Sequence, residues 1–331
     1  MEPTASTAPS EMEVPAAHAG RRLDKFLRAQ FKGVPAGLIF RHLRKGGIRV
    51  NGRKADGGYR IQEGDVLTLP AFEVQDAAPK QPPPKALVAR LNRAIVYEDE
   101  QLLIVDKPAG VPVHVGTGHR GGVIEALRAD RPHEPDLDLA HRLDRETSGL
   151  LILTKTPAML RYLSELFAQG DAVRRDYVAL VRGAWPERLT ELTDPIARTP
   201  RGVVVAADGD PALTRTRVRR RFGDVATLLD VELITGRKHQ IRVHTSHAGH
   251  PIAGDDKYGD AAFTSRVGGS GLFLHATGLS FPLPDGETLT VTSPTPDSWQ
   301  RIFDRLAGRP PAGNRRGGQR RRGGRRPGRR G

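Results

Sequence analysis

The chain has 331 residues, 52 Lys and Arg against 38 Asp and Glu, a formal net charge of +14 and no cysteine. At roughly 150 residues per domain, this length predicts two domains and a sizeable buried core. The lack of cysteine excludes disulfides, thiolate zinc sites, iron–sulfur clusters and a thiol nucleophile. The sequence contains no run of about 18 uncharged apolar residues, so we expect no membrane span.

The two ends of the chain differ in charge. Residues 1–19 contain three glutamates and no Lys or Arg, so we expect a disordered lead that is neither a signal nor a transit peptide, and a cytoplasmic protein. Residues 308–331 contain ten Arg and no acid, and residues 20–307 keep a net charge of +7. This composition predicts a disordered tail that binds polyanions through counterion release, with a merely solubilising tail as the alternative.

Residues 20–70 have the pattern of a small unit. Apolar spacing predicts helices over 21–31 and 35–47. Alternation predicts strands within 48–52 and 59–70, around turns at Asn51–Gly52, Gly57–Gly58 and Glu63–Gly64. The second helix carries a basic stripe formed by Arg41, Arg44 and Lys45. Such a unit suits RNA shape recognition, although an ordinary solvated helix face explains the charges equally well.

Residues 71–90 contain QPPPK and little periodic apolar content, which predicts a linker. In residues 91–307 the strands outnumber the helices and do not alternate with them. We expect an α+β domain with a mainly antiparallel mixed sheet flanked by helices. Its helices are expected at 123–129 and 157–169, and its strands within 94–107 and at 150–155, 176–183, 203–207, 214–222, 227–234 and 273–281.

Two patterns imitate cofactor and metal sites. Gly116, Gly118 and Gly121 match G-x-G-x-x-G, but no acid ends a second strand about 20 residues on, so we expect no nucleotide cofactor. A histidine cluster lacks the helical four-residue spacing with an intervening Glu, so we expect phosphate contacts or packing rather than a metal site. Its members are His239, His244, His247 and His250.

The most informative segment is HRLDRETSGLLILTK, residues 141–155. Asp144 lies between Arg142 and Arg145 in a polar turn that leads into an apolar strand. The flanking guanidinium groups favour its carboxylate form, as a nucleophile or base requires. From residue types alone, a structural aspartate held by salt bridges is the alternative.

This segment resembles the signature of the pseudouridine synthases that act on large-subunit ribosomal RNA, most closely the C type. Further matches follow in order: EDEQLLIVDKPAGVPVH upstream, then RRDYVALVRG, TGRKHQIRVHTSHAGHPIAGDDKYGD and LFLHA. The resemblance runs from about Ala94 to Phe281, and residues 21–52 resemble the small αL-motif RNA-binding domain of the same family.

The resemblance implies an isomerase that converts specific uridines of 23S ribosomal RNA to pseudouridine, without metal, cofactor or energy source. It implies Asp144 as the nucleophile, Tyr177 as the ring that stacks on the base and helps remove its carbon-5 proton, and Arg242 as the partner of Asp144. Arg142 would fill the space of the flipped base, and Leu274, with Leu272 and Phe273, would wall the pocket.

Alternatives stay open at this point. Tyr177 also fits a core strand and Arg242 a helix-surface phosphate contact. Leu272, Phe273 and Leu274 fit an ordinary core equally well. The whole chain also fits a non-catalytic RNA-binding assembly factor, or a synthase of the same family that acts on another RNA such as tRNA. We expect ribosomal RNA as the partner and a monomer.

Overall fold

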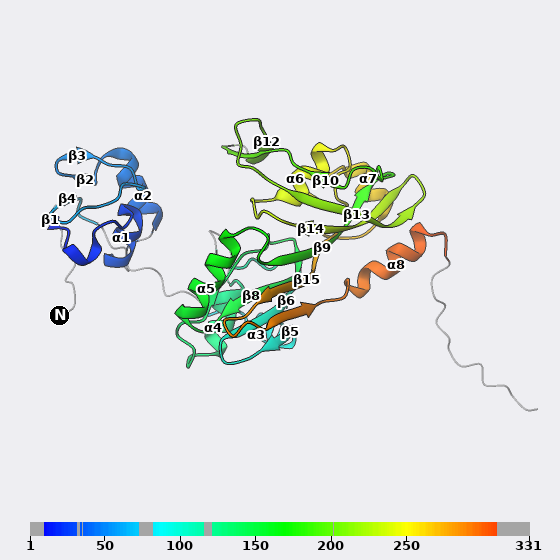
Figure 1. The fold of residues 1–331 in the computed structure, drawn as a ribbon, viewed down its shortest axis with the longest axis horizontal. Coiled ribbons are helices and arrows are strands. Elements are labelled where there is room, and N and C mark those ends of the chain that lie inside the picture. Colours follow the sequence, from blue (N-terminus) through cyan, green and yellow to red (C-terminus); the bar gives the residue numbers. More distant parts are fainter. Residues whose placement is uncertain are drawn as a thin grey trace, which may run out of the picture. The chain divides into compact units, whose positions relative to one another are not determined.

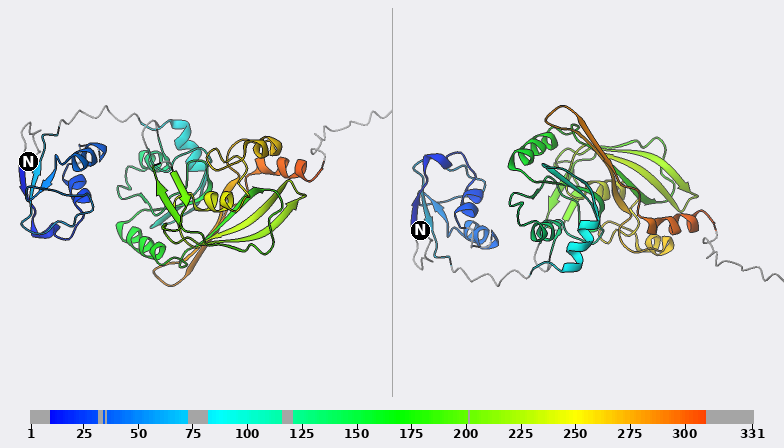
Figure 2. Two further views of the ribbon diagram at one scale, coloured as in Figure 1. Left: turned by 90° about the horizontal axis from the view of Figure 1, so that it is seen from above. Right: turned by 90° about the horizontal axis from the view of Figure 1, so that it is seen from below.

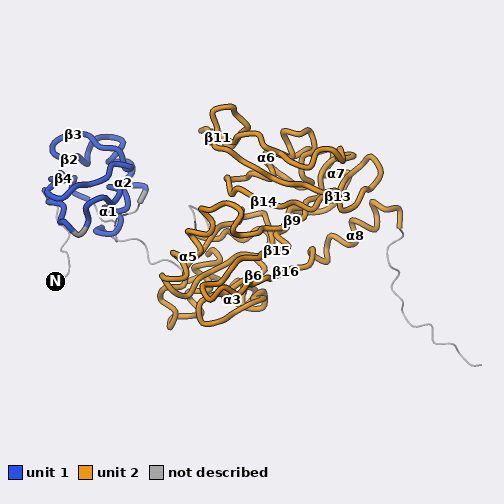
Figure 3. The backbone as a smooth tube through the Cα atoms, in the orientation of Figure 1, with its two compact units in different colours: residues 1–81 blue, residues 82–331 orange. Residues whose placement is uncertain are grey.

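The computed structural model describes residues 10–31, 34, 36–72, 82–115, 121–200 and 202–309. The chain divides into two compact units, residues 1–81 and 82–331 (Figure 3). Each unit has its own buried apolar core.

The first unit packs two helices against a small antiparallel sheet with strand order β1-β4-β2-β3 (Figure 1). Its elements are β1 (Ser10–Glu13), η1 (Ala16–His18), α1 (Leu23–Gln30), α2 (Ala36–Lys45), β2 (Arg49–Val50), β3 (Arg53–Lys54) and β4 (Val66–Leu69). The apolar stripes of both predicted helices are buried, as Leu23 and Ile39 illustrate. Asn51 and Gly52 form the predicted turn with φ of 49° and 74°, the positive pair that a two-residue hairpin favours.

One prediction for this unit is wrong in part. The lead is ordered from residue 10, because β1 pairs antiparallel with β4 and Val14 is buried beside it; residues 1–9 lie outside the described part. Within the alternating segment 59–70, the named strand is β4 alone; the chain turns at Glu63–Gly64 as predicted, with a φ of 79° at Gly64. Two apolar side chains among acids were too weak a signal for β1.

The predicted linker is too long. Helix α3 (Lys85–Arg93) begins directly after the proline run, buries Leu91 completely and contacts α4 (Val123–Asp130). Leu87, Val88 and Leu91 form the apolar stripe that fixes it. The prolines masked this stripe, although a proline before the first turn is compatible with a helix start.

The second unit is built on one large mixed sheet, which confirms the predicted fold class. In its described part the strand order is β10-β13-β14-β9-β15-β8-β6-β5, with β16 beside β15 and β7 beside β8. Among the strand pairs that the structure describes in this sheet, only β15–β8 is parallel. The strands are β5 (Ile95–Glu98), β6 (Leu102–Lys107), β7 (Asp138–Leu139), β8 (Ser148–Thr154), β9 (Arg174–Arg182), β10 (Glu191–Leu192), β13 (Thr214–Phe222), β14 (Ala226–Leu233), β15 (Leu274–Pro282) and β16 (Thr288–Thr292).

Strand β8 is buried at all seven positions because helices cover both faces of the sheet there. Its odd-numbered leucines pack with α3 and α4, whereas Leu150 and Ile152 pack with α5 (Pro157–Ala168). Figure 2 shows these helices on either side of the central strands. The continuous run LLIL is therefore the expected pattern for a strand covered on both faces. Gly149 is required because a Cβ there would lie 2.2 Å from the carbonyl oxygen of Ala276 in β15.

The second half of the sheet contains the predicted β13, whose alternate arginines point to solvent. The hairpin of β11 (Ile196–Thr199) and β12 (Gly202–Val205) packs against α6 (Gln240–His247). Two further helices, α7 (Ala261–Val267) and α8 (Asp297–Leu306), complete the unit. Neither α7 nor α8 was expected from the sequence.

Candidate active site

Asp144 lies in the turn that joins β7 to β8, and the backbone of this turn is held by a buried lysine. The side chain of Lys107, at the end of β6, is fully buried. Its Nζ donates to the carbonyl oxygens of Pro108, Val111 and Arg145 at 3.0, 2.9 and 3.0 Å. One ammonium group thus ties the loop after β6 to the residue that follows Asp144.

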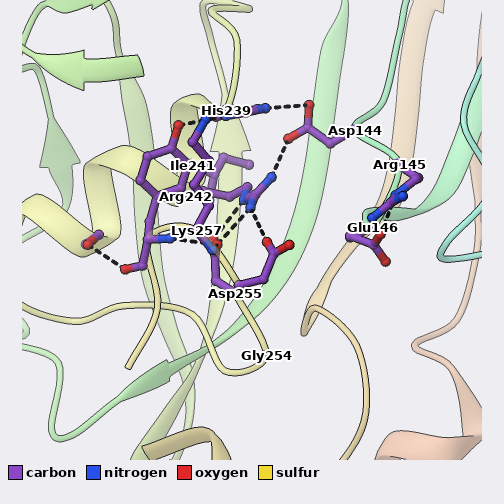
Figure 4. A network of polar contacts seen from close by, with 12 residues as sticks. Asp144, Arg145, Glu146, His239, Ile241, Arg242, Gly254, Asp255 and Lys257 are labelled. Carbon is purple, nitrogen blue, oxygen red and sulfur yellow. Dashed lines mark hydrogen bonds and ion pairs between the residues drawn. The ribbon is translucent and has the colours of Figure 1, made fainter. Parts of the chain in front are cut away.

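Arg242 of α6 contacts Asp144 (Figure 4). Its Nη1 donates to Oδ2 of Asp144 at 3.3 Å, while Nε and Nη2 form a bidentate pair with Asp255 at 2.8 and 2.7 Å. Nη2 also reaches Asp256 at 3.3 Å. Burial alone would lower the pKa of Arg242, but the bonds and charges of Asp255 and Asp144 raise it. Arg242 is 5% exposed, which contradicts the helix-surface alternative.

His239 provides a second contact to Asp144. Its Nε2 lies 3.6 Å from Oδ1 of Asp144, and its Nδ1 lies 2.7 Å from the Tyr258 hydroxyl. Burial lowers the pKa of His239 and neighbouring cations act in the same direction, while Asp144 opposes them. The ring is therefore neutral at neutral pH. If Tyr258 donates to Nδ1, the Nε2 proton faces Asp144.

Tyr177 of β9 and Leu274 of β15 line the same pocket as Asp144. The pocket has a volume of about 250 Å³, and Phe167 of α5 adds a second ring to its wall. Burial raises the pKa of Tyr177 to about 12, with Asp144 adding to the shift and Arg175 opposing it. The phenol therefore keeps its proton at neutral pH.

Leu272 and Phe273 do not line this pocket. Both are core residues, and the Phe273 ring packs on Trp299 at a centroid distance of 4.9 Å. Leu274, the next residue along, is the one that the strand turns towards Asp144. The expectation that all three residues wall the pocket is wrong for the first two.

Arg142 is exposed and borders both this pocket and a second one of about 400 Å³, which also includes Asp144. The second pocket is lined by further cationic side chains, among them Arg145, Lys238 and Lys257. Together they give the approach to Asp144 a positive charge, which favours a polyanion.

Sequence reasoning did not assign four residues of this site: Arg175, His239, Asp255 and Tyr258. All four belong to segments that carry the family resemblance: RRDYVALVRG, TGRKHQIRVH and GDDKYGD. Their mutual distances depend on the tertiary fold, and no spacing rule would have revealed them.

The other histidines of the predicted cluster point to different places. His244 bonds Thr214 and the carbonyl oxygen of Asp194, and His250 bonds the carbonyl oxygen of Arg182. His247 is exposed. Within the described residues no three His, Cys, Asp or Glu side chains are placed to hold a metal ion.

The glycine pattern and the helix lengths bear on the two remaining expectations, a nucleotide site and a membrane span. Gly116 and Gly118 of the glycine pattern lie outside the described residues, and Gly121 precedes α4. Among the helices that the structure describes, none has the length and apolar character needed to cross a membrane.

Comparison with known sequences identifies two families. The RNA pseudouridylate synthase family matches residues 101–247, and the S4 domain family matches residues 21–67. Ribosomal large subunit pseudouridine synthase C of Escherichia coli K12 is 41% identical over 305 residues, which cover 88% of this chain and 95% of that protein. The enzyme of the same name from Haemophilus ducreyi is 42% identical over 301 residues, covering 87% and 92%.

Solved structures of RNA pseudouridylate synthase domains are also similar to this chain. Human RNA pseudouridylate synthase domain containing 4 aligns with a TM-score of 0.55 and 26% identity, covering 67% of this chain and 95% of that one. Human RNA pseudouridylate synthase domain containing 1 aligns with a TM-score of 0.51 and 25% identity, covering 66% and 95%.

Proposed function

Because the chain belongs to the RNA pseudouridylate synthase family, we propose that it converts uridines of 23S ribosomal RNA to pseudouridine with Asp144 as the nucleophile. The protein is an isomerase. The substrate follows from its relatives, which are named for the large ribosomal subunit and match most of this chain, and from the S4 domain with its exposed basic helix face.

The observation that carries the role of Asp144 is its geometry. Its two carboxylate oxygens face separate donors, Arg242 on one side and His239 on the other. The group lies at a pocket with an aromatic wall. A carboxylate held in this way is oriented before a substrate enters.

A uridine stacked in RNA does not expose its glycosidic bond, so the target base must flip out of its stack. Arg142 lies at the pocket mouth, where its long side chain is suited to occupying the vacated space. Tyr177 offers a stacking face to the flipped base. Burial raises the pKa of its hydroxyl to about 12, so the phenol carries its proton when the base arrives.

The reaction balances within the substrate. The C1′–N1 bond breaks, the ring turns and a C1′–C5 bond forms. C5 loses a proton and N1 gains one, so no co-reactant is consumed. We therefore propose that the reaction is cofactor-independent. We also propose that the protein acts on ribosomal RNA in the cytoplasm as a monomer.

The test is tritium release from large-subunit ribosomal RNA labelled at carbon 5 of uridine. We expect release by the wild type and none by Asp144→Asn. Asp136→Asn is the matched control, because Asp136 is exposed and the charge change is the same. If the wild type binds this RNA but releases no tritium, a transfer RNA substrate is tested next and the proposed substrate is wrong.

A further inference from the structure

Arg175 of β9 is a buried cation without a carboxylate partner. It is 7% exposed, and among the described residues no Asp or Glu lies within ion-pair distance of it. Nη2 donates to the carbonyl oxygen of Ile234 at 2.5 Å and reaches that of Gly170 at 3.5 Å, and the guanidinium lies over the Phe167 ring, with Cζ 5.7 Å from its centroid. Nε is buried and finds no acceptor among the described residues. Burial lowers its pKa, yet an arginine stays charged.

An uncompensated buried charge is costly, and replacing one with an apolar side chain of similar size often stabilises a protein. The second arginine of the site shows the contrast, since Arg242 is neutralised by Asp144, Asp255 and Asp256. An orphaned buried donor at a pocket points to a group that arrives with the substrate.

The position of Arg175 indicates which group this is. Residues two apart in a strand share one face, so Arg175 stands beside Tyr177, and both line the pocket of Asp144. Its Nη1 lies beside Gly236, where an added Cβ would be 3.0 Å away. A phosphate of the RNA backbone stays near the pocket mouth, whereas a flipped base enters the pocket far enough to reach a buried group.

The chemistry also places negative charge on the base. If a carboxylate adds to C6 of uracil, the electron pair of the C5–C6 bond moves towards O4. If the C1′–N1 bond breaks first, its electron pair leaves with the ring and spreads over N1, O2 and O4. In both cases the carbonyl oxygens of uracil gain charge before the C1′–C5 bond forms.

We propose that Arg175 donates to a carbonyl oxygen of the flipped uracil and stabilises the charge that develops there. Arg175 is then a catalytic residue that complements Asp144. Asp144 acts as the nucleophile, and Arg175 stabilises the negative charge that moves onto the uracil oxygen. This inference rests on the proposed function and deepens it, because it names the part of the substrate that the pocket recognises.

Single-turnover rates and RNA affinities of Arg175→Met and Arg175→Lys test the proposal, with the labelled large-subunit ribosomal RNA as the probe. Removing a donor to developing charge typically costs about 10²–10³-fold in rate. We expect a loss of that size for Arg175→Met, with an RNA dissociation constant within about 3-fold of the wild type, and a smaller loss for Arg175→Lys. Arg174→Met is the matched control, because Arg174 is exposed on the other face of β9 and should keep the wild-type rate.

A structural role would show itself differently. It predicts a lower melting temperature and a rate that falls only with the folded fraction. If Arg175→Met fails to fold, Gly236→Ala shifts the guanidinium group by a few tenths of an ångström without deleting it, because the new Cβ would lie 3.0 Å from Nη1. Gly236 is exposed at the start of the loop to α6. The Gly236→Ala variant should therefore show a lower single-turnover rate at unchanged stability.

An RNA with an abasic residue at the position that the wild type modifies distinguishes base from phosphate. If Arg175 contacts uracil, Arg175→Met and the wild type bind the abasic RNA equally well. Weaker binding by the variant would assign Arg175 to a phosphate and overturn the proposal, as would a wild-type single-turnover rate for Arg175→Met. If the wild type itself converts no uridine, the proposed function fails instead.

Discussion

Replacing Arg242 with Met should destabilise the second unit far more than replacing Asp144 with Asn does. Arg242 forms its two shortest bonds with Asp255, whose side chain is 1% exposed, and a longer one with Asp144, whose side chain is 20% exposed. Removing one partner of a buried pair leaves an uncompensated charge and costs about 3–5 kcal/mol. We expect Arg242→Met to lose about this much free energy of unfolding through Asp255, and Asp144→Asn to lose less than about 1 kcal/mol.

The stability loss of Arg242→Met should depend on pH through the Asp255 carboxyl. Burial raises the pKa of Asp255, but the bonds and charge of Arg242 outweigh this and lower it. In the wild type Asp255 therefore stabilises the fold above its unfolded pKa, and this stabilisation is lost as pH falls through its folded pKa. Without Arg242, only the backbone N–H groups of Lys257 and Tyr258 still oppose the effect of burial, so the pKa of Asp255 rises and protonation in acid relieves part of the penalty. The stability difference between the wild type and Arg242→Met should thus shrink between neutral pH and about pH 5.

Urea unfolding followed by tryptophan fluorescence is the assay. The chain has two tryptophans, Trp185 and Trp299, and both are buried in the second unit, so the signal reports that unit alone. A loss below about 1 kcal/mol at neutral pH, or a loss that does not change with pH, would refute the assignment of the energy to Asp255.

Three further predictions concern the loop, the histidine and the tail. Lys107→Met should destabilise the second unit by more than about 1 kcal/mol, because three carbonyl oxygens lose their donor. Burial lowers the pKa of Lys107 to about 7, so the wild type should gain stability as the pH rises from 7 towards the pKa of the unfolded chain. The variant should not show this gain, and urea titrations at several pH values measure it. His239→Gln keeps a neutral donor near the Nε2 position and should retain most of the single-turnover rate, whereas His239→Leu should lose about 10-fold or more; equal rates would remove His239 from the site. Deleting residues 310–331 should reduce the slope of log affinity against log salt in RNA binding, and an unchanged slope would contradict a role of the tail in RNA affinity.

The sequence predicted those elements whose apolar pattern survives in the fold. Strand β13 occupies the predicted residues because exposed arginines alternate along it with buried or half-buried side chains that face the sheet core. Helix α6 has no such pattern, since Gln240, Arg242, His244 and Thr245 are all buried. Their polar groups are satisfied by tertiary contacts, such as the bonds of Gln240 to Leu213 and Thr214. Burial of polar side chains removes the signal on which helix prediction depends.

Helix α8 is a different case, because its signal was present and overlooked. Trp299, Ile302, Phe303 and Leu306 recur at helical spacing and pack on the core. For the site, the sequence alone singled out Asp144, and the family resemblance added Tyr177, Arg242 and Leu274 to it. The pairing of Asp144 with His239, 95 positions away, and the unpaired charge of Arg175 required coordinates, because both depend on which strands become neighbours.

The place of β15 in the sheet has a consequence for protein synthesis. In the described part, β15 is the strand that links β9 to β8, and it begins only at Leu274. A growing chain forms its amino-terminal strands first, yet the two halves of the sheet have no shared strand until residues near the carboxyl end leave the ribosome. A nascent chain that stops before Leu274 thus lacks one wall of the pocket and the strand that brings Tyr177 and the Asp144 turn together. Activity should therefore begin only after β15 has been synthesised, and a chain that stops before Leu274 should be inactive.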